Sequence, residues 1–266
     1  MKILNKKIAA AFVLITSFVA QTPLFADTDH IDKIKVGTEG TYNPFTYKDE
    51  QGVLTGYDVE VLREVDRRDP TLEFEFIASP WDTLFLGLDA NRFQVLANQI
   101  VSNPDREKRY YMTDYSYFTG VSQLIVKGGR TDIKSMLDLK GKKVASLVGS
   151  SHTRALEDWN MKNNNIFKIT YYEGDITLVL QDIQNGRIDA TINDPLMAQD
   201  KAKIQGLNIQ VIGDERIAAA PTRFLFQKNA DGLRLKQKID RALKSMTEDG
   251  TLSQMSLKQF GKDYTK

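Results

Sequence analysis

The sequence of 266 residues contains no cysteine and only two histidines. The absence of cysteine excludes disulfides, thiolate metal sites, cysteine nucleophiles and a lipid anchor on an N-terminal cysteine. His30 lies close to the N-terminus, and His152 follows two serines. A nucleophile and its base need hydrogen-bond reach and an orienting third group, and adjacency in sequence does not supply these. Serine–histidine catalysis is therefore not expected.

The usual motifs of cofactor and metal enzymes are also missing. No phosphate-binding loop, dinucleotide fingerprint or HExxH sequence is present, and residues 37–40 lack the GxGxxG spacing. The acidic residues are scattered along the chain rather than grouped as metal ligands. We expect no cofactor, no metal and no catalytic residue, and hence a protein that is not an enzyme.

Only one long apolar run occurs, and it lies at the N-terminus. Lys2, Lys6 and Lys7 precede an apolar run over residues 8–19, and Ala26 offers a small residue for cleavage. This is the pattern of a secretory signal peptide. The run is shorter than the ~20 residues of a transmembrane helix. Residues 1–26 are predicted to be removed, which leaves a secreted or periplasmic protein without a lipid anchor.

The charge of the chain is close to neutral, with 36 basic and 35 acidic residues. Removal of residues 1–26 takes away three lysines and no acidic residue, so the formal charge becomes −2. Because nucleic acid binding relies on basic surfaces, nucleic acid is not an expected partner.

Short apolar runs with strand character alternate with runs of helical periodicity, which is typical of an α/β fold. The alternation forms two blocks, roughly residues 31–117 and 123–215, followed by a strand and helices. Strands are predicted within residues 34–36, 74–76, 95–97, 117–126, 142–147, 188–192 and 224–226. Helices are predicted around residues 57–65, 84–88, 153–162, 177–184 and 235–246, with another beginning at Pro195.

Polar residues follow several of the predicted strands, where open α/β sheets bind ligands. Each has a plainer alternative. Trp81 could belong to the core or to a pocket wall, and Arg106 lies in a polar loop rich in charges. Ser150 or Ser151 could bind an anion or cap a helix, and Asp194 could accept an ammonium group or cap the helix that begins at Pro195.

Many short stretches, in order along nearly all of the chain after residue 26, resemble the extracytoplasmic polar amino acid-binding proteins of ABC importers. Glu39, the pair Asn98-Gln99 and the tail at residues 260–265 resemble the cystine-binding branch of that family. The stretches that carry the resemblance are 36–45, 54–61, Trp81-Asp82, Asn98-Gln99 with Arg106, 139–144, 185–190, 249–252 and 260–261.

The resemblance implies a periplasmic-binding-protein-like clamshell of two α/β lobes joined by two hinge strands. Lobe 1 would comprise residues 27–120 and 218–266, and lobe 2 residues 121–217. Arg106 would grip the ligand carboxylate with the Ser150-Ser151 turn, and Asp194 would hold the ammonium group. Tyr42 and Trp81 would enclose the ligand's side chain, and Glu39 and Asn98 would bind its polar far end. Gln99 and Gly120 would contribute near the ligand carboxylate and at the wall next to the hinge.

The function implied is capture of an amino acid, L-cystine above all, by lobe closure and its delivery to the permease of an ABC importer by a monomeric protein. Val101 stands where the family usually has threonine, so a hydroxyl donor is lost unless Ser102 replaces it. Two alternatives remain open: a cell-surface adhesin derived from the family, and an enzyme of the cyclohexadienyl dehydratase type with Glu39 as its acid.

Overall fold

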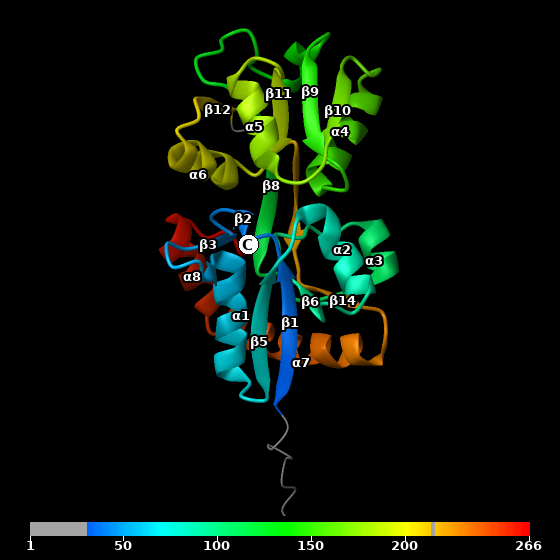
Figure 1. Cartoon of the computed structure of the whole chain (residues 1–266), viewed down its shortest axis with the longest axis vertical. Helices are drawn as coiled ribbons and strands as arrows, with labels where there is room; N and C mark the ends of the chain where they lie inside the picture. Colours follow the sequence, from blue (N-terminus) through cyan, green and yellow to red (C-terminus); the bar gives the residue numbers. More distant parts are fainter. Residues whose placement is uncertain (1–30, 214–215) are drawn as a thin grey trace, which may run out of the picture. The chain divides into compact units, whose positions relative to one another are not determined.

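The computed structural model describes residues 31–213 and 216–266. The signal peptide predicted for residues 1–26 lies outside the described residues. Residues from Ile31 to Lys266 form one compact unit that contains two lobes, each a β-sheet with helices packed on it (Figure 1). Among the described helices, none has the length and apolar character needed to cross a bilayer.

The sheet of the first lobe has the strand order β5-β1-β6-β14-β7. Its central strand β1 pairs in parallel with β5 and β6, whereas β14 runs antiparallel to β6 and β7. The bounds are β1 (Asp32–Thr38), β5 (Leu72–Ala78), β6 (Val95–Leu96), β7 (Tyr110–Met112) and β14 (Leu225–Gln227). The chain moves from β1 outward to β5 and then back past β1 to β6. Right-handed crossovers therefore place α1 (Tyr57–Arg68) and α2 (Trp81–Asp89) on opposite faces of the sheet.

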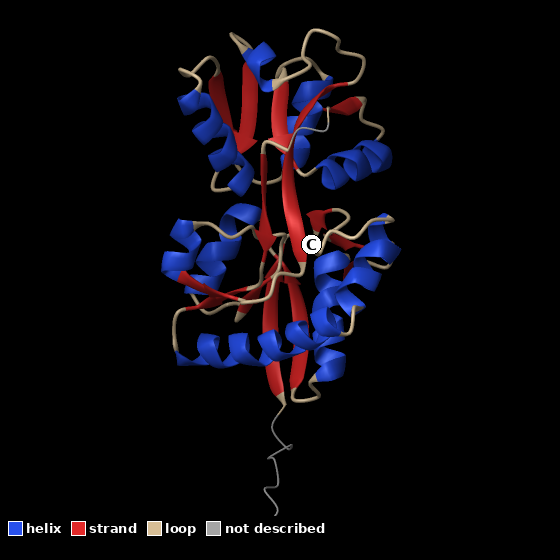
Figure 2. Ribbon diagram, turned by 180° about the vertical axis from the view of Figure 1, so that it is seen from behind, coloured by secondary structure: helices blue, strands red, loops and turns tan. Residues whose placement is uncertain are grey.

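Smaller elements complete the first lobe. The loop after β1 forms a three-stranded sheet of β2 (Thr41–Tyr42), β3 (Thr46–Lys48) and β4 (Leu54–Thr55). The C-terminal helices α7 (Ala230–Glu248) and α8 (Thr251–Phe260) return to this lobe, where α7 contacts β7 and β14 and α8 contacts α1. Figure 2 shows α7 lying across the strands of this sheet.

The second lobe also consists of a mixed β-sheet covered by helices. Its sheet has the order β10-β9-β11-β8-β12, with β8 antiparallel to both β11 and β12. The strands are β8 (Phe118–Lys127), β9 (Lys143–Leu147), β10 (Lys168–Tyr172), β11 (Ala190–Asn193) and β12 (Ile209–Ile212). They are covered by α4 (Ser151–Lys162), α5 (Ile176–Gln184), α6 (Pro195–Gln205) and a short 3₁₀ helix, η1 (Met136–Leu139).

Two antiparallel strands lie between the lobes. The first five residues of β8 pair with β13 (Ala218–Thr222), from Phe118 opposite Thr222 to Ser122 opposite Ala218. Beneath them the ring of Tyr117 stacks on Phe224 with centroids 4.3 Å apart. The lobe boundaries at residues 120–121 and 217–218 stay a prediction, because residues 31–266 form a single compact unit.

Most elements that periodicity predicted are present, and Pro195 begins α6 as expected. One expectation at the site was wrong. Arg106 does not lie in a loop, because residues Pro104–Arg109 form the short helix α3, with Asn103 as its N-cap and proline in its first turn. The second hinge strand expected from the resemblance is present as β13, whereas the strands β10 and β12 were not predicted. The residues of β10 and β12 are exposed or only partly buried, so the apolar signal of these two strands is weak.

Candidate functional site

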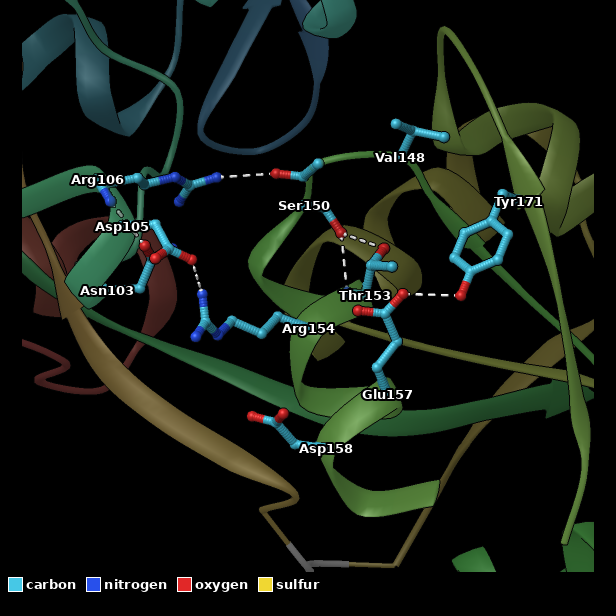
Figure 3. A pocket seen from close by; sticks show the side chains of 11 residues that line it. Asn103, Asp105, Arg106, Val148, Ser150, Thr153, Arg154, Glu157, Asp158 and Tyr171 are labelled. Carbon is cyan, nitrogen blue, oxygen red and sulfur yellow. Dashed lines mark hydrogen bonds and ion pairs between the residues drawn. The ribbon is translucent and has the colours of Figure 1, made fainter. Parts of the chain in front are cut away.

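Three cavities follow one another along the boundary between the lobes. The central one has a volume of about 30 Å³ and receives side chains from both sheets. It shares Ser150 with a cavity of about 520 Å³ beside Arg106 (Figure 3) and Glu39 with a cavity of about 420 Å³ on its other side. The central cavity is lined by Glu39, Tyr42, Trp81, Asn98, Gln99, Leu147, Ser150, Ser151, His152 and Asn193.

Seven of the ten residues predicted for the site therefore line the central cavity. The remaining three are Arg106, which lines the neighbouring cavity, and Asp194 and Gly120, which lie just outside. Sequence reasoning did not place Leu147, His152 or Asn193 in the site. Asn193 ends a strand and directly precedes Asp194, and this position could have identified it.

Arg106 is a buried guanidinium without an acidic partner among the described residues. It is 7 % exposed, and its NH1 and NH2 groups donate to the carbonyl oxygens of Val101 (2.8 Å) and Gly149 (3.1 Å). Its cationic carbon lies 5.7 Å from the ring of Trp81 and 5.2 Å from that of Phe85. Burial lowers the pKa of Arg106 to about 10. A buried cation whose partners are carbonyl oxygens and aromatic rings is suited to bind an anion, because an ion pair would compensate its charge.

Aromatic side chains of the first lobe reach the second lobe. The indole Nε1 of Trp81, at the start of α2, donates to the carbonyl oxygen of Val148 at 3.1 Å. The hydroxyl of Tyr42 donates to Oδ1 of Asn193 at 2.6 Å. Trp81 also packs in a hydrophobic cluster with Leu84 and its neighbours. It therefore belongs to the core and also lines the wall of the central cavity.

The loop from β9 into α4 supplies the wall of the second lobe. The Ser150 side chain accepts a hydrogen bond from the backbone N–H of Thr153 at 3.0 Å and so caps α4, while also lining the cavity. Ser151 is the first residue of that helix. Figure 3 shows the side chains of Ser150 and Thr153 side by side at the start of this helix, in the wall of the cavity. A turn at the start of a helix favours a carboxylate.

His152 continues this wall and joins the two lobes. Its Nδ1 lies 2.7 Å from the hydroxyl of Ser122, and its Nε2 lies 3.5 Å from the hydroxyl of Tyr42. Burial, followed by the charge of Arg106, lowers the pKa of His152 to about 4. The imidazole is therefore neutral near pH 7. Within residues 31–213 and 216–266, the ring nitrogens have only the two hydroxyl groups as side-chain partners, and no carboxylate orients the ring as in a catalytic triad.

Glu39 and Asn98 form a buried pair at the other end of the central cavity. The amide nitrogen of Asn98 donates to Oε2 of Glu39 at 3.2 Å, and Oδ1 of Asn98 accepts the backbone N–H of Glu39 at 2.7 Å. Burial, and then the nearby charge of Asp175, raises the pKa of Glu39 to about 7. Among the described residues, no lysine or arginine forms an ion pair with Glu39, so its carboxylate is suited to a ligand ammonium group.

Gln99 is held in an uncommon backbone conformation, with φ at 49°. The buried carboxylate of Asp58 fixes it by accepting the backbone N–H of Gln99 at 2.5 Å and the hydroxyl of Tyr117 at 2.9 Å. Burial raises the pKa of Asp58 to about 7. Asp58 therefore positions the strand-end loop that carries Asn98 and Gln99.

Asp194 is 4 % exposed, and it caps α6 by accepting the backbone N–H groups of Leu196 (2.8 Å) and Met197 (3.3 Å) at Oδ1. Burial raises the pKa of Asp194 to about 7. The capping alternative is thus realised, and the ammonium-binding role stays a prediction. Gly120 lies against Val101, where a Cβ atom would come 2.9 Å from Cγ2.

Ser102 does not replace the hydroxyl donor missing at Val101. Its hydroxyl donates to the carboxylate of Glu107. The Val101 side chain packs beside Gly120. Within residues 31–213 and 216–266, no group of three or more histidine, aspartate or glutamate side chains is placed to hold a metal ion.

Comparison with known proteins shows which proteins this chain resembles. Residues 34–262 match the bacterial extracellular solute-binding proteins, family 3. An L-cystine-binding protein of Bacillus subtilis is 40% identical over 234 residues, which cover 88% of this chain and 83% of that protein. A probable amino-acid ABC transporter-binding protein of Haemophilus influenzae is 38% identical over 242 residues, covering 90% of each chain.

Among solved structures, a putative L-cystine ABC transporter protein from Listeria monocytogenes superposes with a TM-score of 0.79. The two sequences are 32% identical, and the match covers 89% of this chain and 99% of that one. Both the family match and the structural similarity extend over nearly all described residues. The chain belongs to the bacterial extracellular solute-binding proteins of family 3.

Proposed function

We propose that this protein binds L-cystine outside the cytoplasm, in the cleft between its lobes, and delivers it to the permease of an ABC importer. The observation that carries the proposal is the buried guanidinium of Arg106, which has no acidic partner among the described residues and faces the Ser150 turn. A ligand α-carboxylate would satisfy this group bidentately. The cystine-binding names of several relatives support the choice of ligand.

Binding would operate by lobe closure. Tyr42, Trp81 and Arg106 of the first lobe each hydrogen-bond to the second lobe directly. The central cavity of about 30 Å³ is far smaller than the ~300–1,000 Å³ of small-molecule sites. An amino acid therefore enters only when these contacts open. The bound amino acid would then contact both lobes in place of these direct hydrogen bonds. Because it can contact both lobes only when they are closed, it would bind the closed state more tightly.

The proposal extends to the export and assembly of the protein. Residues 1–26 would be cleaved as a signal peptide, the chain without cysteine would carry no lipid anchor, and it would act as a monomer. A chain beginning at residue 27 should elute at the mass of one copy.

The binding test is a thermal-shift screen of the protein against the common amino acids and L-cystine. Ligand at 100 times its Kd adds about 2.7 kcal/mol to the free energy of unfolding. For a chain of this size, this raises the melting temperature by roughly 5–10 °C. A rise with L-cystine supports the proposal. If only another amino acid raised the melting temperature, that amino acid would be the ligand in place of L-cystine. If no amino acid raised the melting temperature, the proposal of amino acid binding would be refuted.

One observation favours a second candidate, a dehydratase. Glu39 is a buried carboxyl whose pKa of about 7 would suit a general acid. However, both of its oxygens accept hydrogen bonds, from Asn98 and from Thr41, and a carboxyl that accepts at both oxygens is poorly placed to donate a proton. The discriminating measurement is incubation with prephenate and arogenate, and turnover of either would establish the enzyme.

A further inference from the structure

A cavity of about 420 Å³ lies on the other side of Glu39 from the central cavity. It is bounded by the first lobe through Glu39, Thr41 and Lys48, and by the second lobe through Gly174 and Asp175. Its volume falls within the ~300–1,000 Å³ range of small-molecule sites. It meets the central cavity at Glu39, so it continues the path that begins at Arg106.

Two carboxylates, those of Glu39 and Asp175, line this cavity. The Thr41 hydroxyl donates to Oε1 of Glu39 at 3.2 Å, and it lines the same cavity as the carboxylate of Asp175. The cavity thus brings together two carboxylates, one from each lobe. The charge of Asp175 helps to raise the pKa of Glu39, which shows that the two groups repel each other. A ligand group with several N–H donors and a positive charge would relieve this repulsion and pair with Glu39.

The nearby lysine does not meet this need. Lys201 is 3 % exposed, and its ammonium group contacts Oδ1 of Asp175 at 3.2 Å and the hydroxyl of Thr177 at 2.7 Å. It compensates Asp175, while Glu39 keeps its raised pKa of about 7 despite the presence of Lys201. Lys48 is the one cationic residue that lines the cavity among those described.

We propose that this cavity is a second amino-acid subsite, in which the far ammonium group of a two-headed ligand lies between the carboxylates of Glu39 and Asp175. The far carboxylate would lie on the side of Lys48. The inference rests on the proposed function, in which the near head of the ligand binds at Arg106. Asp175 then acts as a specificity residue contributed by the second lobe, and the far head helps to close the lobes because it contacts both.

The test uses four ligands that share one cysteine head and differ at the other end. L-Cystine carries both far groups, and the mixed disulfide of cysteine and cysteamine carries only the far ammonium. The mixed disulfide of cysteine and 3-mercaptopropionate carries only the far carboxylate, and S-methyl-L-cysteine carries neither. Dissociation constants are measured by titration calorimetry on the secreted protein and on the variants Asp175→Asn and Glu39→Gln.

Asparagine caps helices as well as aspartate does, so Asp175→Asn should preserve α5, whose N-cap is Asp175. The matched control is Asp182→Asn, which makes the same change on the same helix, where Asp182 pairs with Arg187 and Tyr172 away from the cavity. Thermal unfolding of each variant without ligand checks that the fold is intact. Glu39→Gln gives an independent measurement if Asp175→Asn fails to fold.

The expected result is a loss of about tenfold or more in affinity for the two ligands with a far ammonium, in both variants, since each loses one charge-assisted hydrogen bond. The affinity for the other two ligands should stay within about twofold, and the control should match the unmodified protein throughout. Equal losses for all four ligands, or no loss for cystine, would overturn the subsite. Failure of the unmodified protein to bind any of the four would instead refute the proposed function.

Discussion

Replacement of Arg106 by methionine separates the energetics of ligand binding from those of folding. Methionine fills a similar space without charge, so Arg106→Met removes the partner proposed for the ligand carboxylate. Each hydrogen bond to a charged group contributes about 1.5–3 kcal/mol. Loss of a bidentate pair should therefore weaken binding by about 3–6 kcal/mol, or roughly 100- to 10,000-fold.

The stability of the ligand-free protein should respond very differently. Burial holds the pKa of Arg106 at about 10, so the buried charge itself costs free energy that methionine does not. Against this gain, the carbonyl oxygens of Val101 and Gly149 lose their donor, at about 1–3 kcal/mol for each buried group. These contributions oppose each other, and we expect the net change to be within about 2 kcal/mol.

The assay is titration calorimetry with L-cystine, together with thermal unfolding in the presence and absence of ligand. The matched control is Arg154→Met, because Arg154 forms an exposed ion pair with Asp105 beside the same cavity. Exposed pairs contribute about 0–1 kcal/mol, so the control should bind nearly as the unmodified protein does. If Arg106→Met kept its affinity within tenfold, the carboxylate site would lie elsewhere.

Three further predictions test the contacts around the cleft. Tyr42→Phe removes the 2.6 Å hydrogen bond to Asn193 and the contact with His152. The affinity for cystine, measured by calorimetry, should change by at least threefold. An unchanged affinity would show that the hydrogen bond to Asn193 has no part in lobe closure. Gly120→Ala places a Cβ atom 2.9 Å from Cγ2 of Val101, so denaturant unfolding should show a loss of about 1–3 kcal/mol, which the added Val101→Ala should partly restore. Burial raises the pKa of Asp58 to about 7, whereas the pKa of this carboxyl in the unfolded chain is near 4. Protonation of Asp58 therefore stabilises the fold. This stabilisation is complete below about pH 4 and is lost as the pH rises through 7. The stability of the unmodified protein relative to Asp58→Asn should therefore increase by up to about 4 kcal/mol between pH 7.5 and 4, and a constant difference in urea unfolding would contradict the raised pKa.

The sequence by itself determined the class of fold and the general position of the site. Alternation of strand and helix periods requires packed α/β layers, because each element must bury one apolar face. Polar residues at strand ends, such as Glu39, Asn98 and Asp194, then fall at one edge of each sheet, where ligands bind. Pro195 and Ser150 act as local helix signals, and local signals need no knowledge of distant residues.

Only the tertiary structure decided which of these residues meet. His152 follows two serines in sequence, yet the serine within hydrogen-bond distance of its ring is Ser122, 30 residues away on the hinge-proximal strand β8. Asp175 carries the signal of an ordinary helix cap, and it becomes a candidate ligand group because the lobes bring it to Thr41 and Glu39. Periodicity and capping depend on neighbours within one or two turns, whereas contacts between lobes depend on how separate sheets pack.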